Sequence, residues 1–301
     1  MNTVWYDPAM TPTPVVVVLV EPAGPRNVGS VARLCANFSI SELRLVAPRC
    51  DPHGDEARQM AVHGGWVLDQ ARLFGSLAEA LRDCRRVVAT SGRGAGEPLP
   101  LLPLGSALPW LLEPNGPEQP GTPEQVPAPR AIVFGREDRG LTNDELLQAG
   151  RLLQIETGEA YGSLNLSHAA AVVLHSLHNL RSNNSLRSEV GLDSPQQQPE
   201  PLPPLAATPL PEPSCRAELE ALLRDAEQLL LAVGFLYPHT AHARLAKLRA
   251  LLQRAQISSA EVALLRGMVR QLRWASQQAA SPPGALPQEA PSVGPPQVSP
   301  R

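Results

Sequence analysis

The sequence predicts an α/β protein with a mainly parallel sheet, followed by a small all-α C-terminal domain. In the first part of the chain, short apolar runs alternate with stretches of helical periodicity, as in strand–helix–strand units. After residue 213 the short apolar runs stop and only helical periodicity remains. A chain of 301 residues has room for one medium and one small domain.

The strands are predicted from β-branched, apolar segments. The run VVVVLV, residues 15–20, is apolar on both alternating faces, as expected for a strand buried on both sides. Four more short runs predict further strands over residues 42–48, 85–91, 130–135 and 151–156. Together they are enough for one parallel sheet.

Helices are expected between and after these strands, over residues 28–38, 76–84, 142–150 and 164–180. The third opens on a capping box formed by Thr142 and Glu145 and ends at Gly150. The fourth has a broad apolar face, which suits burial or contact with a second subunit.

The 33 prolines are about twice as frequent as in an average protein and mark the segments between domains. We expect a long surface loop over residues 94–129. The predicted division of the chain is a flexible extension (1–13), the α/β domain (14–181), a Pro-rich linker (182–213), the helical domain (214–276) and a disordered tail (277–301).

Three helices are predicted in the C-terminal domain, over residues 215–233, 240–254 and 258–276. The last two carry a local basic excess, and the candidates for RNA contact are Arg244, Lys247, Arg266, Arg270 and Arg273. The last three of these fall on one helix face. This stripe is either an ordinary solvated face or a surface that contacts phosphates.

Composition excludes several classes of protein. The net charge is −3, so the whole chain is not strongly basic. The four cysteines form no C-x-x-C pair, so neither a zinc site nor a disulfide framework is indicated, and no metal is expected. The apolar run 15–20 is far too short to span a membrane and has no basic segment before it. We therefore expect a cytoplasmic protein.

Polar, glycine-containing stretches follow the predicted strands at their carboxyl ends, where parallel sheets bind ligands. They are NVGSVAR (27–33), TSGR (90–93), VFGREDRGL (133–141) and SLNLSHAA (163–170). Asn27 alone would suit a helix cap and Arg33 alone a surface position. Gly135 and Gly140 have phosphate-loop spacing, but the Lys and hydroxyl pair is missing, so a nucleotide enzyme with a phosphate loop is disfavoured.

Taken in this order, the motifs resemble those of the SPOUT class of RNA methyltransferases, in particular the tRNA ribose methyltransferases of the TrmH and TrmJ type. NVGSVAR resembles the first motif, N-x-G-x-x-x-R, VFGREDRGL the second and SLNLS the third. The resemblance covers residues 14–181. The helical segment is similar to the C-terminal extension of the TrmJ members.

The resemblance implies a trefoil knot at the sheet edge and S-adenosylmethionine as cofactor. By position, the cofactor-binding residues would be Thr90, Ser91, Gly92, Gly135, Ile155, Ser163, Leu164 and Asn165. Asn27 and Arg33 would be catalytic. A guanidinium stays protonated in proteins, so Arg33 is expected to stabilise an anion, while Asn27 orients Arg33 or the ribose. Glu137 is expected to hold the second-motif loop.

Members of this family are homodimers whose active sites are completed by the partner, so the same is expected here, with the helices that begin near Asn27 and at residue 164 as candidate interfaces. The leading function is 2′-O-methylation of tRNA at cytidine or uridine 32 of the anticodon loop. Two alternatives stay open: the same reaction on another RNA such as ribosomal RNA, and a catalytically silent RNA-binding protein.

Overall fold

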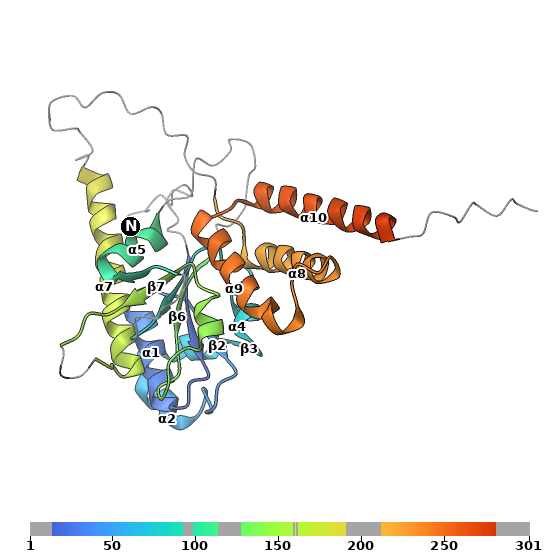
Figure 1. Ribbon diagram of the computed structural model, residues 1–301. Coiled ribbons are helices and arrows are strands. Elements are labelled where there is room, and N and C mark those ends of the chain that lie inside the picture. Colours follow the sequence, from blue (N-terminus) through green and yellow to red (C-terminus); the bar gives the residue numbers. More distant parts are fainter. Residues whose placement is uncertain are drawn as a thin grey trace, which may run out of the picture.

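A computed structural model describes residues 14–92, 99–113, 128–158, 160, 162–190 and 212–280. In this part of the chain, a seven-stranded sheet has helices on both faces, and three C-terminal helices pack beside it (Figure 1). The strand order is β3-β2-β1-β6-β4-β7-β5, and every neighbouring pair is parallel. The predicted fold class is confirmed, while the knot stays a prediction.

The five predicted strands are all present, as β1 (Val15–Val20), β2 (Glu42–Val46), β4 (Val87–Thr90), β6 (Arg130–Phe134) and β7 (Arg151–Gln154). Two strands that were not predicted, β3 (Arg72–Phe74) and β5 (Leu101–Pro103), form the two edges of the sheet. Each has three residues, which is too short for an apolar period to be recognised.

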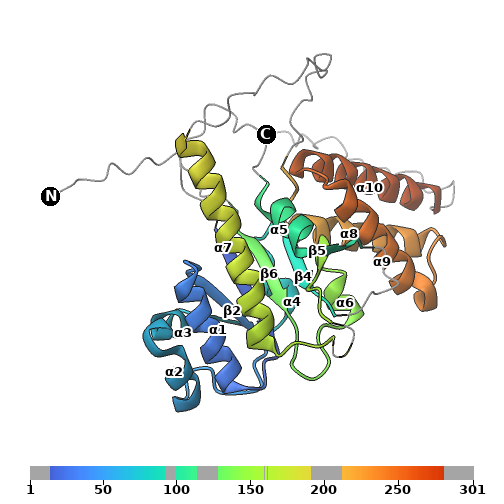
Figure 2. The same ribbon diagram turned by 90° about the vertical axis from the view of Figure 1, so that its left-hand side faces the viewer.

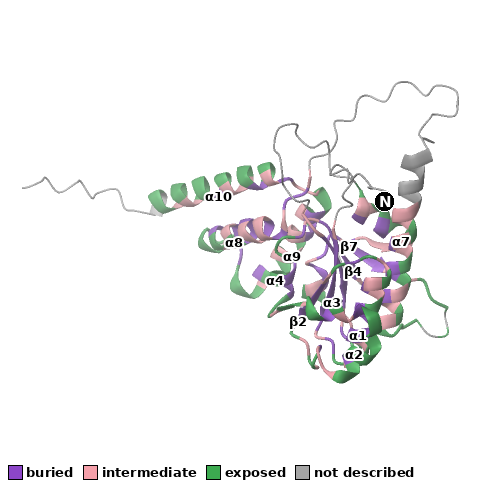
Figure 3. Ribbon diagram, turned by 180° about the vertical axis from the view of Figure 1, so that it is seen from behind, coloured by how far each residue is buried: buried purple, intermediate pink, exposed green. Residues whose placement is uncertain are grey.

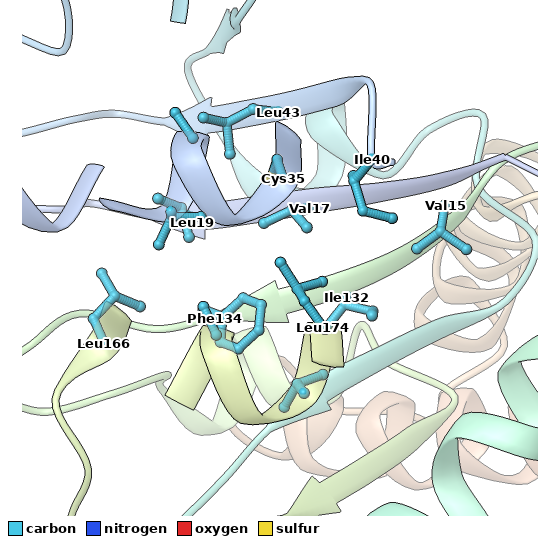
Figure 4. Close-up of a cluster of buried hydrophobic side chains, with 14 of the residues drawn as sticks. Val15, Val17, Leu19, Cys35, Ile40, Leu43, Ile132, Phe134, Leu166 and Leu174 are labelled. Atoms are coloured by element: carbon cyan, nitrogen blue, oxygen red, sulfur yellow. The ribbon is translucent and has the colours of Figure 1, made fainter. Parts of the chain in front are cut away.

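The central strand β1 is buried along its whole length because both faces of the sheet are covered. Val15, Val17 and Leu19 pack into a core shared with α1 (Pro25–Asn37) and α7 (Leu166–Val190), as Figure 4 shows. Val16, Val18 and Val20 point to the opposite face. They pack into a second core shared with the short helices α4 (Leu77–Ala80) and α6 (Asn143–Leu146). Because successive side chains of a strand point to opposite faces, β1 contributes to both cores.

Helix α1 is held close to a helical segment that was not predicted, namely α2 (Asp55–Ala61), the 3₁₀ turn η2 (Val62–Gly64) and α3 (Gly65–Asp69). A Cβ at Gly29 would lie 2.0 Å from the carbonyl oxygen of Ala57. Gly29 is therefore needed for the close contact between α1 and α2.

The expected surface loop over residues 94–129 was partly wrong, because it contains β5 and the helix α5 (Leu104–Leu112). Three apolar side chains of α5, Ala107, Leu108 and Leu111, are fully buried in the first core. Their burial outweighs the unfavourable position of Pro109 inside the helix. Residues 93–98 and 114–127 lie outside the described part.

Two helix ends also differ from the predictions. The capping box of Thr142 and Glu145 is present, but α6 ends at Leu146 rather than at Gly150. A Cβ at Gly150 would lie 2.8 Å from the Trp110 ring, so this glycine serves close packing and not a helix end. Helix α7 continues to Val190, past the predicted end at residue 180.

The C-terminal domain contains the three predicted helices, α8 (Arg216–Ala232), α9 (Pro238–Ala255) and α10 (Ser259–Ala280). Helices α8 and α10 lie side by side (Figure 1) and share a small apolar core that includes Leu222 and Val269. In Figure 3 the exposed colour covers most of α10, so this helix packs on the bundle along one side only.

The helical domain is attached to the sheet domain through α9, which lies beside α6 (Figure 2). Ala250 is fully buried in the second core, and the Gln253 side chain donates a 3.0 Å hydrogen bond to the carbonyl of Leu147. The main chain of Arg216 donates to the carbonyl of Cys84. The two domains therefore share a continuous packed contact.

The predicted extension over residues 1–13 and the segments 191–211 and 281–301 lie outside the described residues. The division of the chain into five segments stays a prediction. No helix in the described part is both long and apolar enough to cross a membrane.

Candidate active site

A pocket of about 540 Å³ opens at the carboxyl ends of three neighbouring strands, β4, β6 and β7. It is lined by the loops that follow these strands and by the residues before α7. The sequence placed its candidate motifs at this edge, and the sheet order brings the three loops together.

Most of the predicted cofactor residues line this pocket. They are Thr90, Ser91, Gly92, Gly135, Ile155, Ser163 and Leu164. Asn165 is not among the lining residues. Its side-chain oxygen instead accepts hydrogen bonds from the Ser167 amide at 2.9 Å and hydroxyl at 2.7 Å, at the start of α7. This gives Asn165 the role of a helix cap.

The pocket wall combines apolar side chains with exposed main chain. Phe134, Leu153 and Leu166 supply apolar surface, and Gly92 and Gly162 leave the backbone accessible. Such a wall offers amide and carbonyl groups for hydrogen bonds and a flat apolar surface for a ring. These features suit a neutral heterocycle better than a polyphosphate.

The second motif forms a tight loop at the rim. Arg136 and Gly140 exchange main-chain hydrogen bonds, and Gly140 has a positive φ of 69°. A Cβ at Gly135 would lie 2.4 Å from the carbonyl carbon of Gly140. Only glycine fits both positions without strain, so these two residues fix the shape of the loop.

The loop is anchored by Arg136, whose side chain is almost fully buried between Glu21 and Glu145. Glu21 directly follows β1 with a positive φ of 43°, and its carboxylate pairs with Arg136. Hydrogen bonding from Arg136 is the main cause that lowers the pKa of Glu21. Sequence reasoning missed this anchor because its partners are far apart along the chain.

Glu137 connects the second motif to the first. Its carboxylate accepts hydrogen bonds from the amides of Ala23 and Gly24, both at 3.0 Å, and from the Asn27 side chain at 3.1 Å. Burial acts to raise the pKa of Glu137, but these hydrogen bonds outweigh it and leave the pKa below its usual value. Asn27 is thus a partner of Glu137, and the N-cap of α1 is Gly24.

Arg33 lies apart from this cluster. It is six residues beyond Asn27 on α1, or about 9 Å along the helix axis, and its side chain is exposed. It does not line the pocket. The structure of this chain therefore brings Asn27 to the pocket rim through Glu137 but does not bring Arg33 there.

The predicted RNA-binding residues divide into two groups. Arg266 pairs with Asp225 at 2.9 Å, and Arg273 donates to the Asp225 carbonyl and the Gln228 side chain, both at 3.0 Å. These two arginines therefore join α10 to α8, and their contact with RNA stays a prediction.

The other three predicted RNA-binding residues are exposed. Arg270 and Lys247 form no ion pair within the described part of the chain. Arg244 donates a hydrogen bond to the carbonyl of Phe235. Among the described residues, no group of three or more His, Cys, Asp or Glu side chains is arranged to hold a metal ion.

The chain is similar to known RNA methyltransferases over both of its domains. The model of the SpoU rRNA Methylase family matches residues 14–175, and the model of the tRNA methyltransferase TrmJ C-terminal domain matches residues 217–283. These two matches cover the sheet domain and the helical domain separately.

Similar proteins extend over nearly the same length. The tRNA (cytidine/uridine-2′-O-)-methyltransferase TrmJ of Cronobacter sakazakii is 34% identical over 254 residues, which is 84% of this chain and 93% of that protein. The corresponding Pseudomonas aeruginosa protein, which is named as a cytidine/uridine/adenosine methyltransferase, is also 34% identical, over 84% of this chain and 91% of its own. The crystal structure of TrmJ from Z. mobilis ZM4 covers 86% of this chain and 99% of its own, with 27% identity and a TM-score of 0.66.

Proposed function

The chain belongs to the SpoU methylase family and to its TrmJ members, and from this premise we propose that it methylates the ribose 2′-hydroxyl of cytidine or uridine 32 in the anticodon loop of tRNA. The observation that carries the proposal is the joint match of the catalytic and the C-terminal helical regions, at 34% identity over 84% of the chain. Together these two regions argue for a tRNA substrate over ribosomal RNA.

The cofactor that we propose is S-adenosylmethionine, which supplies an activated methyl group on a sulfonium. The pocket volume of about 540 Å³ lies within the usual range for a ligand of this size. Seven of the eight residues proposed by position line it. The hydroxyl of Thr90 already donates to the Val133 carbonyl at 3.1 Å, so this side chain helps to hold the wall in place.

The catalytic roles follow from what each side chain can do. A guanidinium carries a positive charge in proteins, so we propose that Arg33 stabilises the alkoxide that develops on the ribose and binds the adjacent phosphate. Asn27 and Glu137 hold the first helix turn against the pocket rim and position the ribose. Methyl transfer needs the attacking oxygen in line, so positioning supplies a large share of the rate.

A homodimer would complete the site. Arg33 lies outside the pocket of its own subunit, and exposed apolar side chains gather nearby on the segment that packs against α1, including Met60, Val62 and Trp66. We propose that this face and α7, where Val172 is exposed, form the dimer contact. Arg33 of one subunit would then act at the pocket of the other.

The helical domain would hold the tRNA through its exposed basic residues Lys247, Arg270 and Arg244. We propose that the protein acts in the cytoplasm, where its tRNA substrate is found. Because the domain is packed against α6, which lines the pocket through Leu146, tRNA bound to it would be held at a fixed position relative to the pocket.

The test is a methyl-transfer assay with labelled S-adenosylmethionine, bulk tRNA and ribosomal RNA, followed by nuclease mapping of the product. We expect label in tRNA as a 2′-O-methylated pyrimidine at position 32. Label in ribosomal RNA alone would overturn the substrate. Cofactor binding without label in either RNA would favour a silent RNA-binding protein.

A further inference from the structure

The turn between α8 and α9 presents aromatic side chains to solvent next to basic ones. Phe235 is 60% exposed and Tyr237 is 54% exposed, while Leu236 between them is only 3% exposed. The Phe235, Tyr237, His239 and Arg244 side chains form what we call the aromatic turn. Two large aromatic side chains this exposed in one short turn are unusual, since burying them would be favourable.

The aromatic turn is held in one conformation. Gly234 has a positive φ of 74°, and the amides of Phe235 and Leu236 both donate 2.9 Å hydrogen bonds to the carbonyl of Leu230. The buried Leu236 fixes the turn to the bundle, so its two neighbours point outward. Arg244 closes the turn with a 2.8 Å hydrogen bond to the carbonyl of Phe235.

The exposed rings are paired with cationic or imidazole groups. The Arg244 guanidinium lies 5.7 Å from the centre of the Phe235 ring. The Tyr237 and His239 rings are stacked, with their centres 6.0 Å apart and their planes 21° apart. Helix α9, which continues from the turn, contains no Asp or Glu. The turn and the helix that follows it therefore combine flat rings with positive charge.

Helix α9, which follows the turn, contacts a helix that lines the candidate active site. His242, one helical turn beyond His239, contacts Asp144 of α6 at 3.2 Å, and α6 contributes Leu146 to the pocket wall. Helix α9, which begins at the turn, thus lies on the same side of the molecule as α6 (Figure 2).

We propose that the aromatic turn is a stacking site for unpaired nucleotides of the substrate RNA, a proposal that rests on the proposed function. Proteins bind single-stranded RNA by stacking unpaired bases on aromatic rings and by placing cations along the phosphates. Phe235 and Tyr237 provide the rings, and Arg244 and Lys247 provide the cations. The site would hold loop nucleotides next to the target ribose.

The test compares full-length variants in tRNA binding, with an anticodon stem-loop RNA as a second probe. We expect Phe235→Ala and Tyr237→Ala each to weaken RNA binding at least about five-fold. The melting temperature and the affinity for S-adenosylmethionine should not change. Phe235→Trp should bind as the wild type does. The control is Leu264→Ala, which removes another apolar side chain, 73% exposed, from α10 and should have no effect.

Substitution by leucine separates stacking from simple apolar contact. Phe235→Leu and Tyr237→Leu keep apolar surface but lose the flat ring, so we expect them to bind RNA as weakly as the alanine variants. Full RNA binding by the leucine or the alanine variants would overturn the proposal. A change in oligomeric mass in Phe235→Ala, measured by light scattering, would also overturn it in favour of a contact between subunits. Failure of the wild type to methylate tRNA would count against the proposed function alone.

Discussion

A single carboxylate, that of Glu137, joins two motifs that are more than a hundred residues apart in the chain. It accepts from the Asn27 side chain and from two main-chain amides at the start of α1. These amides have no partners within the helix, and a negative charge is favourable at that end. Glu137 thus stabilises the start of α1 and fixes Asn27 at the same time.

Replacing Glu137 with Gln should remove this connection. One carboxylate oxygen would become an NH₂ group that faces donors. Because Glu137 is exposed to solvent, we expect a loss of only about 0.5–1.5 kcal/mol in the free energy of unfolding at pH 7. Urea unfolding would measure it. Methyl transfer should fall more than cofactor affinity, because Asn27 is released while the pocket loops remain.

The pH dependence gives an independent check. The pKa of Glu137 is lowered in the folded protein, so its contribution to stability is present above the unfolded pKa of about 4.3 and is lost as the pH falls through the lower folded value. The stability difference between the wild type and Glu137→Gln should therefore shrink below about pH 4. A difference that stays constant there would contradict the assigned hydrogen bonds.

The role proposed for Arg33 can be separated from folding by a matched substitution. Arg33→Ala should reduce methyl transfer at least a hundred-fold, on the order of one lost anion-stabilising donor, while leaving cofactor binding unchanged. The control is Arg26→Ala, which removes another exposed arginine of α1, one paired with Glu56 at 2.9 Å. Equal activity of both variants would remove Arg33 from the mechanism. Mixing an Arg33→Ala subunit with a pocket-defective subunit would restore activity only if the site is shared between subunits.

At the scale of elements, strands that are long and apolar could be predicted from the sequence, and short or context-dependent ones could not. The run over Val15–Val20 is apolar on both faces and forms the central strand as expected. Helix α5 was not predicted because its prolines favour a loop. The burial of its apolar side chains against the sheet outweighs this local preference. Local sequence patterns do not reveal such long-range contacts.

In the candidate site, the positions of the loops could be predicted from the sequence, but the contacts between them could not. The loops at the carboxyl edge could be located because each follows a strand, and most of the residues proposed by resemblance line the pocket. The contacts of Arg136 with Glu21 and Glu145 and of Glu137 with Asn27 could not be predicted, because they depend on the order of strands in the sheet. The same holds for Arg266, whose spacing on α10 does not show that it faces α8.

The two kinds of arginine on α10 should respond differently to substitution. Arg266→Ala breaks a partly exposed ion pair to Asp225, so we expect about 0.5–1 kcal/mol of lost stability. Arg270→Ala should leave stability unchanged and weaken tRNA binding. The slope of the logarithm of the binding constant against the logarithm of salt concentration should fall by about one, as expected for the loss of one phosphate contact. Titrations of tRNA at several salt concentrations would measure this slope. An unchanged slope in Arg270→Ala would show that this face is only solvated.

At the scale of the whole molecule, the helical domain forms part of the support of the pocket. Helix α9 inserts Ala250 into the second core beside Leu141 and Leu146, and both leucines line the pocket. A tRNA held by the helical domain would therefore be held by the same packed unit that shapes the cofactor site. Displacing this domain should affect tRNA and cofactor binding together.

Two adjacent substitutions test this coupling with the same change in charge. Ala250 is fully buried, so Ala250→Arg would place a charge in an apolar contact, which costs several kcal/mol and should undock α9 from α6. Leu251 is 51% exposed, so Leu251→Arg adds the same charge to the surface and should leave docking intact. We expect Ala250→Arg to lower the melting temperature by several degrees and to weaken tRNA binding at least ten-fold. It should also weaken binding of S-adenosylmethionine, measured by calorimetry, because Leu141 and Leu146 lose their support. If Ala250→Arg lost tRNA affinity but kept full cofactor affinity, the helical domain would be a separate RNA-binding attachment, and the pocket would be shaped by the sheet domain alone.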